Sequence, residues 1–430
     1  RARVSVRPEC YGDLIAAQEP ALAFRAKVRL NPAEFRNQKA LRMDFRFTEQ
    51  QQQIRDAIWK LCENYGPDYW LDRDNTGEYP EDFYQALAKD GWLGIAMPEE
   101  YGGSALGISE GCVLMEAIAE SGAGLSGASA VHINIFGPHP LVKHGTKEQK
   151  DRFLPPLIAG KEKTCFGVTE PNAGLNTAAI TTKAERTKTG YIVHGQKMWT
   201  TTAQRADKIL LLARTTPKDQ CKRNFDGISL FYTDLDRNKI EAREIAKMGR
   251  KCVDTNALFI DGLEVREEDR IGEEGRGFYY LLDGLNPERC LIAAEAIGIG
   301  RVALKRAADY ARERVVFGRP IGQNQGIQHP LADSWAKLEA ARLLTYKAAW
   351  LYDSKEPCGG EANAAKYLAA EVGFEACERA VLTHGGMGYA KEFHVERLFR
   401  EIMIARIAPI SRELVLSYIG ERELGLPKSY

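Results

Sequence analysis

Apolar residues recur with a helical period between residues 43 and 163. The stretch FTEQQQQIRDAIWKLCENYG opens with Thr48 and Gln51 in capping-box spacing and continues with apolar residues at helical intervals. PEDFYQALAKDGWLGI predicts a helix that begins at Pro80 and ends at Gly91. Similar patterns return in VLMEAIAES and EQKDRFLPPLIAG. We therefore expect an N-terminal helical domain over residues 43–163.

The period changes over residues 164–276. The stretches there are short, rich in β-branched and aromatic residues, and separated by Gly, Asp and Asn: YIVHGQKMWTTTA, KILLLARTT, GISLFYTDLD and NALFIDGLEV. We expect a middle antiparallel β domain.

Helical patterns return from residue 277 to 430, where we expect a C-terminal helical bundle. A stripe of Leu331, Trp335, Leu338 and Ala341 predicts a core or helix-packing face. Another helix is predicted in LDGLNPERCLIAAEAIGIG, with Asn286 as its N-cap and small apolar residues after it. The whole pattern indicates an α+β fold that is mainly α.

Gly298 and Gly300 resemble part of a dinucleotide-binding fingerprint. Such a fingerprint requires a preceding strand and a helix that opens at the glycines. Here the glycines lie inside a helical pattern, so they predict close helix–helix contact instead.

Composition narrows the possible partners. Basic and acidic residues are equal in number, 59 each, which argues against electrostatic binding to nucleic acid or to an anionic membrane. No apolar run is long enough to predict a membrane span. The nine cysteines form no Cys-x-x-Cys pair, so we expect neither disulfides nor a metal site, and a reducing compartment fits.

Residues 1–42 differ from the rest, with nine basic and four acidic residues. This leader is interpreted as an upstream extension or an organelle transit segment outside the core fold.

Several positions could carry chemistry, and each also has an ordinary structural interpretation. Glu288 in the first turn of an apolar helix either compensates the helix dipole or acts as a base. Trp199, followed by threonines on a strand, either stacks on an aromatic cofactor or packs on the sheet. Arg314 beside a glycine turn either binds phosphate or is a solvated charge. The turn at Gly385 either lets backbone approach a ligand or simply joins two helices.

Together and in this order, the motifs resemble those of the acyl-CoA dehydrogenase family. They cover most of the chain beyond residue 42: Thr169-Glu170-Pro171-Asn172-Ala173-Gly174, Lys197-Met198-Trp199-Thr200-Thr201, Lys247-Met248-Gly249 before Asp254-Thr255, Arg314 with Phe317-Gly318, and Gly385-Gly386 with Gly388-Tyr389.

The resemblance implies an oxidoreductase of fatty acid metabolism that binds FAD between the middle sheet and the C-terminal helices. It implies oxidation of an acyl-CoA thioester to the trans-2-enoyl-CoA, with electrons passed to an electron-transfer flavoprotein. It also implies a homotetramer or homodimer, in the cytoplasm of a bacterium or the mitochondrial matrix of a eukaryote.

The resemblance assigns roles residue by residue. Trp199 packs on the flavin, Thr201 lies near flavin N5, and residues 132–136 line the acyl pocket. Arg289 and Asn286 contact substrate. Further FAD contacts come from the isoalloxazine-lining residues Phe166, Val168 and Thr169, and from Arg314, Phe317, Gln325, Gly385 and Gly386, which reach the FAD of a neighbouring subunit.

Three departures from the family pattern stand out. Leu175-Asn176 replaces a Ser-Asp pair, and Leu382 replaces a Gln before the glycine turn. Ala408-Pro409 stands where many members carry the catalytic Glu. Isovaleryl-CoA and long-chain acyl-CoA dehydrogenases instead carry the base in a stretch similar to Pro287-Glu288-Arg289, which makes Glu288 the expected base here. Glu413 is expected on the following helix, facing away.

Two alternatives remain on the same fold. One is an acyl-CoA oxidase or flavin monooxygenase, which reacts with O₂. The other is a catalytically silent binding member, perhaps on DNA, which the zero net charge disfavours.

Overall fold

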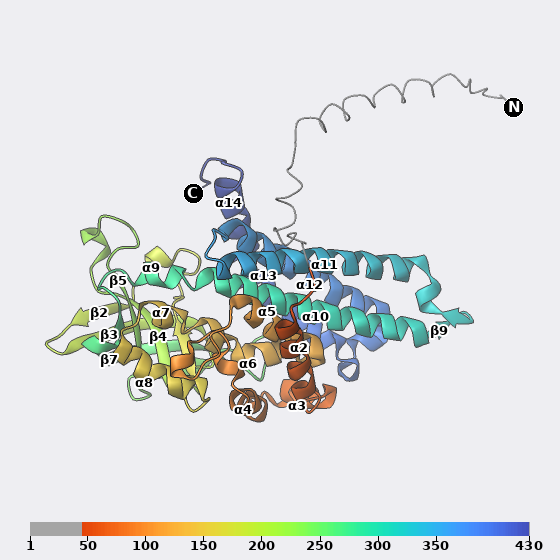
Figure 1. Cartoon of the computed structure of the whole chain (residues 1–430), viewed down its shortest axis with the longest axis horizontal. Helices are drawn as coiled ribbons and strands as arrows, with labels where there is room; N and C mark the ends of the chain where they lie inside the picture. The colour runs from red at the N-terminus through yellow and green to blue at the C-terminus, as the bar shows by residue number, and fades with distance from the viewer. Residues whose placement is uncertain (1–44, 430) are drawn as a thin grey trace, which may run out of the picture. The chain divides into compact units, whose positions relative to one another are not determined.

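The computed structural model describes residues 45–429, so the predicted leader at 1–42 lies outside the described residues. The chain divides into two units, Arg1–Phe47 and Thr48–Tyr430, and the elements below all belong to the second. N-terminal helices come first, a sheet follows, and long helices end the chain (Figure 1).

The N-terminal helices form where the apolar periodicity predicts them. The capping box at Thr48 is present, with both reciprocal hydrogen bonds made, and Gly91 ends the second predicted helix in the left-handed conformation. A π-helical segment, Ala119–Ala123, joins two buried helices. The helices are α2 (Glu49–Cys62), α3 (Pro67–Thr76), α4 (Glu81–Lys89), α5 (Ile108–Ile118), α6 (Gly124–Phe136), α7 (His139–His144) and α8 (Lys147–Ile158).

The middle strands form an eight-stranded sheet in which β6-β7-β3-β2-β4-β5-β8 are successive neighbours and β1 pairs with β4. Their bounds are β1 (Thr164–Gly167), β2 (Lys183–Arg186), β3 (Gly190–Thr201), β4 (Lys208–Arg214), β5 (Ile228–Asp234), β6 (Ile240–Glu244), β7 (Thr255–Arg266) and β8 (Arg270–Ile271).

The prediction of an antiparallel sheet is wrong in one respect, because the sheet is mixed. β1 runs parallel to β4, and β2 pairs in parallel with the end of β4. β2 and β3 intervene between β1 and β4, so the chain has the long connection that a parallel pair needs.

β4 is buried on both faces, which explains its continuous apolar run. Leu210 and Leu212 pack in a core with Phe153 of α8, whereas Ile209 and Leu211 pack in a second core with Phe231 of β5. One face of the sheet is therefore held against the N-terminal helices.

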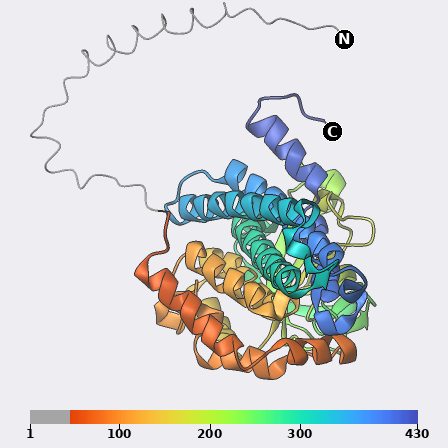
Figure 2. The ribbon, with the colours of Figure 1, turned by 90° about the vertical axis from the view of Figure 1, so that its right-hand side faces the viewer.

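The C-terminal elements are α9 (Gly277–Leu282), α10 (Leu285–Glu313), the hairpin β9 (Val315–Val316) and β10 (Arg319–Pro320), α11 (Gln325–Asp353), α12 (Gly359–His384), the 3₁₀ turn η9 (Gly385–Tyr389), α13 (Val395–Ile407) and α14 (Arg412–Arg422). In the end-on view of Figure 2 the long helices α10 to α12 pack together, and α14 projects from them.

Close helix–helix contact at Gly298 and Gly300 is confirmed. A Cβ on Gly298 would lie 2.4 Å from the carbonyl oxygen of Glu116 on α5, and one on Gly300 would lie 3.1 Å from the Cα of Gly373 on α12. Both glycines let α10 run against its neighbours as the central helix of this half of the molecule.

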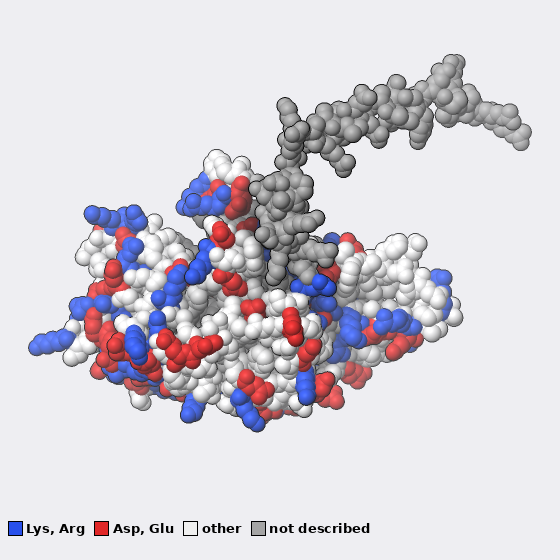
Figure 3. Space-filling view, in the orientation of Figure 1, with Lys and Arg blue, Asp and Glu red and all other residues white. Residues whose placement is uncertain are grey.

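The stripe predicted on α11 is only partly buried. Leu338 and Ala341 are in the core, but Trp335 is exposed in the single chain. On the face shown in Figure 3, basic and acidic side chains are interspersed rather than gathered by sign. No helix within residues 45–429 is long and apolar enough to cross a membrane.

Candidate active site

Glu288 lies in the first turn of α10, where its backbone N–H donates to the carbonyl of Gly284 at 3.1 Å. Its side chain is buried, with 9% exposed. Burial raises the pKa of Glu288 to about 7, although the positive charges of His132 and Arg289 pull that pKa down. A carboxyl group with this pKa can accept and return a proton near neutral pH.

The N-cap prediction for this helix is wrong. α10 begins at Leu285 with Gly284 at the N-cap position, so Asn286 lies inside the first turn. Asn286 instead accepts a hydrogen bond from Arg289 Nη1 at 2.8 Å and donates to Cys358 Sγ at 3.6 Å. The two predicted substrate contacts therefore bind each other beside Glu288.

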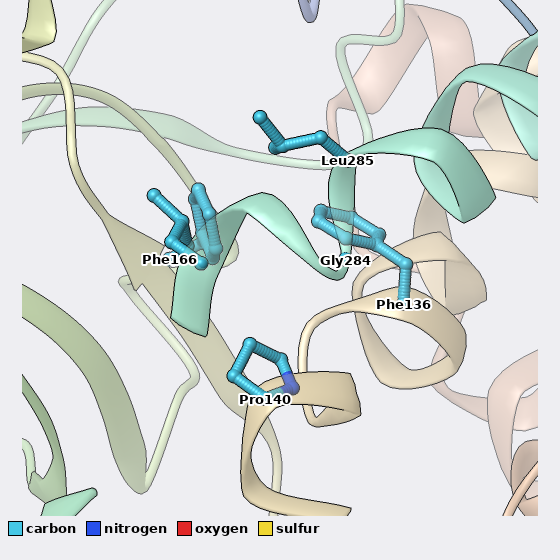
Figure 4. Close-up of a pocket in the computed structure, with 6 residues that line it drawn as sticks. Phe136, Pro140, Phe166, Gly284 and Leu285 are labelled. Atoms are coloured by element: carbon cyan, nitrogen blue, oxygen red, sulfur yellow. The ribbon is translucent and has the colours of Figure 1, made fainter. Parts of the chain in front are cut away.

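A small apolar pocket adjoins the first turn of α10 (Figure 4). The space between its walls is too narrow to hold a water molecule. Its lining comes from four separate parts of the chain: Phe136 of α6, Pro140 of α7, Phe166 of β1, and Leu281, Gly284 and Leu285 around the start of α10. The Phe136 and Phe166 rings lie 5.6 Å apart between centroids, so the end of α6 and β1 share one wall.

Trp199 stands at a bulge in β3, where the pairing with β7 shifts between Lys197 and Thr200. Its backbone is left-handed, with φ +60°, and its side chain is 58% exposed. The simple alternation expected along WTTT is thus broken. Because a bulky residue rarely adopts this conformation, the strained Trp199 points to a functional constraint.

The threonines beyond Trp199 differ in exposure. Thr201 is half-buried, while Thr200 is fully buried. Within residues 45–429 the hydroxyls of Thr200, Thr202 and Thr255 have no hydrogen-bond partner. A buried hydroxyl without a hydrogen-bond partner destabilises the folded protein. This region of β3 and β7 therefore has hydroxyl groups that a bound ligand could pair with.

A buried ion pair joins the Thr-Glu-Pro turn to β3. Lys197 Nζ donates to Glu170 Oε1 at 2.9 Å and to the carbonyl of Val168 at 3.1 Å. Glu170 also accepts from the backbone N–H groups of Thr181 and Thr182. Burial lowers the pKa of Lys197 to about 8 despite the charge of Glu170. The pair fixes the Thr-Glu-Pro turn against β3, and sequence reasoning missed it although both residues lie inside the quoted motifs.

The three residues expected to line the isoalloxazine, Phe166, Val168 and Thr169, have different orientations. Phe166 faces the pocket, whereas the Val168 side chain packs in the core. Thr169 accepts a hydrogen bond from the Met198 N–H at 2.8 Å through its carbonyl. The structure therefore brings Phe166, Val168 and Thr169 beside β3, with Val168 available through its backbone only.

The second set of predicted cofactor residues lies at the other end of α10. Arg314, Phe317 and Gln325 are exposed, and Phe317 is fully exposed at the tip of the β9–β10 hairpin. The Tyr310 and His384 rings stack at 4.3 Å, which places Gly385 beside the last turn of α10. Nothing within 4 Å would meet a Cβ on Gly385 or Gly386, so this backbone is open to a ligand.

Glu288 and Arg314 are separated by nearly the whole length of α10. At 1.5 Å per residue the separation along the helix is roughly 40 Å. One chain therefore does not bring its own Arg314 to its own Glu288.

The segment where other family members carry their base holds no carboxylate. Lys366 Nζ donates to the carbonyl of Ile410 there, at 2.5 Å. Glu413 lies on α14 with its side chain 75% exposed, as expected. Glu288 is instead a buried carboxylate in the first turn of α10, which begins at the pocket-lining Gly284 and Leu285.

Sequence reasoning also missed the charges around Glu288. His132 of α6 forms an ion pair with Glu295 of α10, and Lys366 of α12 faces the same region. One signal was present in the sequence, since Glu288 and Glu295 are seven residues apart, share a helix face and flank a stretch of mainly apolar residues. No set of three potential ligands in the described chain could hold a metal ion.

Comparisons with known proteins agree with the motifs. Family models described as acyl-CoA dehydrogenase N-terminal, middle and C-terminal domains match residues 48–161, 165–263 and 275–424. The acyl-CoA dehydrogenase FadE12 of Mycobacterium tuberculosis is 37% identical over 389 residues, which are 89% of this chain and 98% of that protein.

Two further relatives also match most of the chain. The caffeyl-CoA reductase–Etf complex subunit CarC of Acetobacterium woodii is 34% identical over 84% of this chain and 94% of its own. The structure of butyryl-CoA dehydrogenase from Megasphaera elsdenii superposes with a TM-score of 0.84 at 31% identity, covering 89% of this chain and all of that one. The chain therefore belongs to the acyl-CoA dehydrogenase family, the FAD-dependent oxidoreductases of acyl-CoA thioesters.

Proposed function

We propose that this enzyme converts an acyl-CoA to its trans-2-enoyl-CoA with Glu288 as the base that removes the α-proton. The observation that carries the proposal is a buried carboxylate with a pKa of about 7 in the first turn of α10, beside an apolar pocket. Dipole compensation alone requires neither burial nor a raised pKa, because an exposed acid at a helix N-terminus serves as well.

The residues around β3 fit the isoalloxazine of FAD. Trp199 offers a half-exposed flat ring, and Thr201 lies next to it with unpaired hydroxyls nearby. Phe166 and the backbone near Val168 and Thr169 would complete the wall. Bound FAD supplies the acceptor for the β-hydride.

The chain's own part in the reaction is a proton transfer in an apolar setting. Above its pKa, Glu288 accepts the substrate α-proton while the β-hydrogen leaves as hydride, which creates the α,β double bond. Arg289 and Asn286, which are hydrogen-bonded to each other, would contact the substrate next to its thioester. Burial keeps water from the carboxylate and so raises its pKa.

The pocket favours an apolar acyl group, since all six lining residues are apolar or glycine. Phe136 is one of the residues at 132–136 expected in the acyl pocket. The name of the caffeyl-CoA relative indicates that aryl acyl groups also belong among the substrates to test. Anaerobic bleaching of the flavin by straight, branched and aryl acyl-CoAs would rank them.

An electron-transfer flavoprotein is the proposed electron acceptor, supported by the relative that is named as a subunit of an Etf complex. We further propose that Arg314, Phe317, Gln325 and Gly385-Gly386 bind the FAD of a neighbouring subunit. Their exposure and their roughly 40 Å separation from Glu288 along α10 support a shared site.

The decisive experiment compares Glu288→Gln with the matched variant Glu413→Gln, which alters the exposed glutamate on α14. Glu288→Gln should retain FAD but lose flavin reduction by several orders of magnitude, while Glu413→Gln should reduce normally. Normal reduction in Glu288→Gln together with loss in Glu413→Gln would overturn the assignment. Rapid reoxidation of the reduced enzyme by O₂ would mean that the enzyme is an oxidase and not a dehydrogenase.

A further inference from the structure

We infer that the partly buried ion pair between His132 and Glu295 sets the ionisation of Glu288, so that His132 is a positioning residue for the base. This inference rests on the proposed role of Glu288. It assigns to α6 a function in catalysis beyond its place in the core.

The geometry places three titratable groups together between α6 and α10. Glu288 and Glu295 lie on one face of α10, two turns apart, and His132 meets that face from α6. The Nδ1 of His132 is hydrogen-bonded to Glu295 Oε1, and the Glu295 side chain is almost fully buried. His132 is thus held on the side of α10 that carries the base.

His132 also contacts a residue of the pocket wall. Its ring lies 4.8 Å from the ring of Phe136, which lines the pocket with Phe166. The pair therefore lies directly behind Phe136 of the pocket wall.

The surrounding charges favour the protonated form of His132. Burial alone lowers the pKa of His132, but Glu295 and then Glu288 reverse this and leave the pKa raised. Arg250 opposes that rise from the loop after β6, where its Nη1 donates to Ser129 Oγ at 2.9 Å. The two carboxylates therefore favour the imidazolium of His132, and its charge in turn favours the carboxylate of Glu288.

The groups that face Glu288 have opposing effects. His132 from α6, Arg289 from α10 and Lys366 from α12 favour its carboxylate, whereas burial and Glu295 favour its neutral form. After burial, His132 has the largest influence on Glu288. Removing the charge of His132 should therefore raise the pKa of the base and move activity to higher pH.

The test measures flavin reduction against pH in the FAD-loaded enzyme. Butyryl-, isovaleryl- and octanoyl-CoA are tried, and the one that bleaches the parent fastest is used. The parent should gain activity as pH rises through about 7, where Glu288 loses its proton. In His132→Gln this rise should move up by about one pH unit, which lowers the rate at pH 6, taken relative to the variant's own high-pH plateau, about tenfold.

Two controls separate charge from structure. His132→Lys keeps a positive charge opposite Glu295 and should restore the parent profile. His144→Gln breaks a comparable pair, His144 with Asp283 at 2.6 Å, whose charges do not act on Glu288, and should leave the profile in place. If His132→Gln fails to fold, infrared titration of the Glu288 carboxyl in His132→Lys and in His132→Asn replaces the comparison.

The outcomes distinguish this inference from the proposed function. A lowered plateau with an unmoved pH midpoint in His132→Gln would make His132 structural only and would overturn the inference. A parent-like midpoint in His132→Asn would do the same. Normal reduction by Glu288→Gln would instead remove the base assignment itself, whatever His132 does.

Discussion

At the scale of single residues, Trp199 and Thr201 give a direct test of the flavin site. Trp199→Ala should retain less FAD because the exposed ring at the β3 bulge is lost, and Trp199→Phe should retain more than the alanine variant. Thr201→Val removes one hydrogen bond of about 1 kcal/mol and should slow reduction about fivefold. Flavin absorbance of the purified variants and stopped-flow bleaching measure these effects. Full flavin content and parent-like rates in all three variants would refute the site.

The raised pKa of Glu288 should also make the free energy of unfolding depend on pH, which can be measured without any turnover. Its pKa rises from 4.5 to about 7 in the folded protein because of burial. The folded state therefore holds this proton more tightly, and stability is lost as pH rises from about 4.5 to 7. Glu288→Gln should be more stable than the parent by about 3 kcal/mol at pH 8, with no advantage at pH 4.5.

Denaturant unfolding of both proteins across this pH range measures the difference. A constant difference at all pH values would mean that Glu288 is not buried as a titrating group. The sign matters here, because an ordinary dipole-compensating glutamate would make the variant less stable at pH 8.

Single residues also show how far the sequence could be interpreted. Glu288 was identifiable because a carboxylate at the start of an apolar helix is unusual and matches a family motif. His132 was not, because its partner Glu295 is 163 positions away in the chain, and no local pattern reports which helices pack together. The N-cap was misplaced because Asn286 is a good cap by type, but the chain already turns helical at Leu285.

At the scale of elements, the Lys197–Glu170 pair should be what holds the Thr-Glu-Pro turn against β3. Lys197→Met leaves a buried carboxylate without its cation and should destabilise the protein by about 3–5 kcal/mol. Glu170→Gln combined with Lys197→Met should restore much of that loss, because no buried charge remains. Urea unfolding measures stability, and bound flavin reports the turn. A fully stable, fully flavinated Lys197→Met protein would contradict this role.

The sequence predicts the ends of helices and strands where a cap, a glycine or a continuous apolar run determines them. The capping box at Thr48, the glycine stop at Gly91 and the strand β4 were all predictable. The bulge at Trp199 was not, because β-propensity favours a regular strand through Trp and Thr. The parallel pairing of β1 with β4 also escaped prediction, since the order of strands depends on contacts across the whole sheet.

At the scale of the whole molecule, exposed apolar residues indicate the faces that a second copy would cover. Trp335, Leu343 and Trp350 lie within one stripe of α11, and all are exposed in the single chain. The burial predicted for Trp335 from its pattern would then come from assembly and not from the chain's own core. This extends the proposed sharing of FAD between subunits to a specific helix face.

Arg314 tests whether cofactor binding and assembly are linked. If Arg314 binds the FAD pyrophosphate of a neighbour, Arg314→Ala should lower both the FAD content and the stability of the oligomer, and added FAD should restore assembly by mass action. The matched control is Arg312→Ala, two residues away on the same exposed turn, where the side chain pairs with Asp309 of its own helix. Light scattering after gel filtration, with and without added FAD, measures assembly, and flavin absorbance measures loading. A parent protein that runs as a fully flavinated monomer would contradict the shared site, because its own Arg314 lies too far along α10 to serve the flavin beside Glu288.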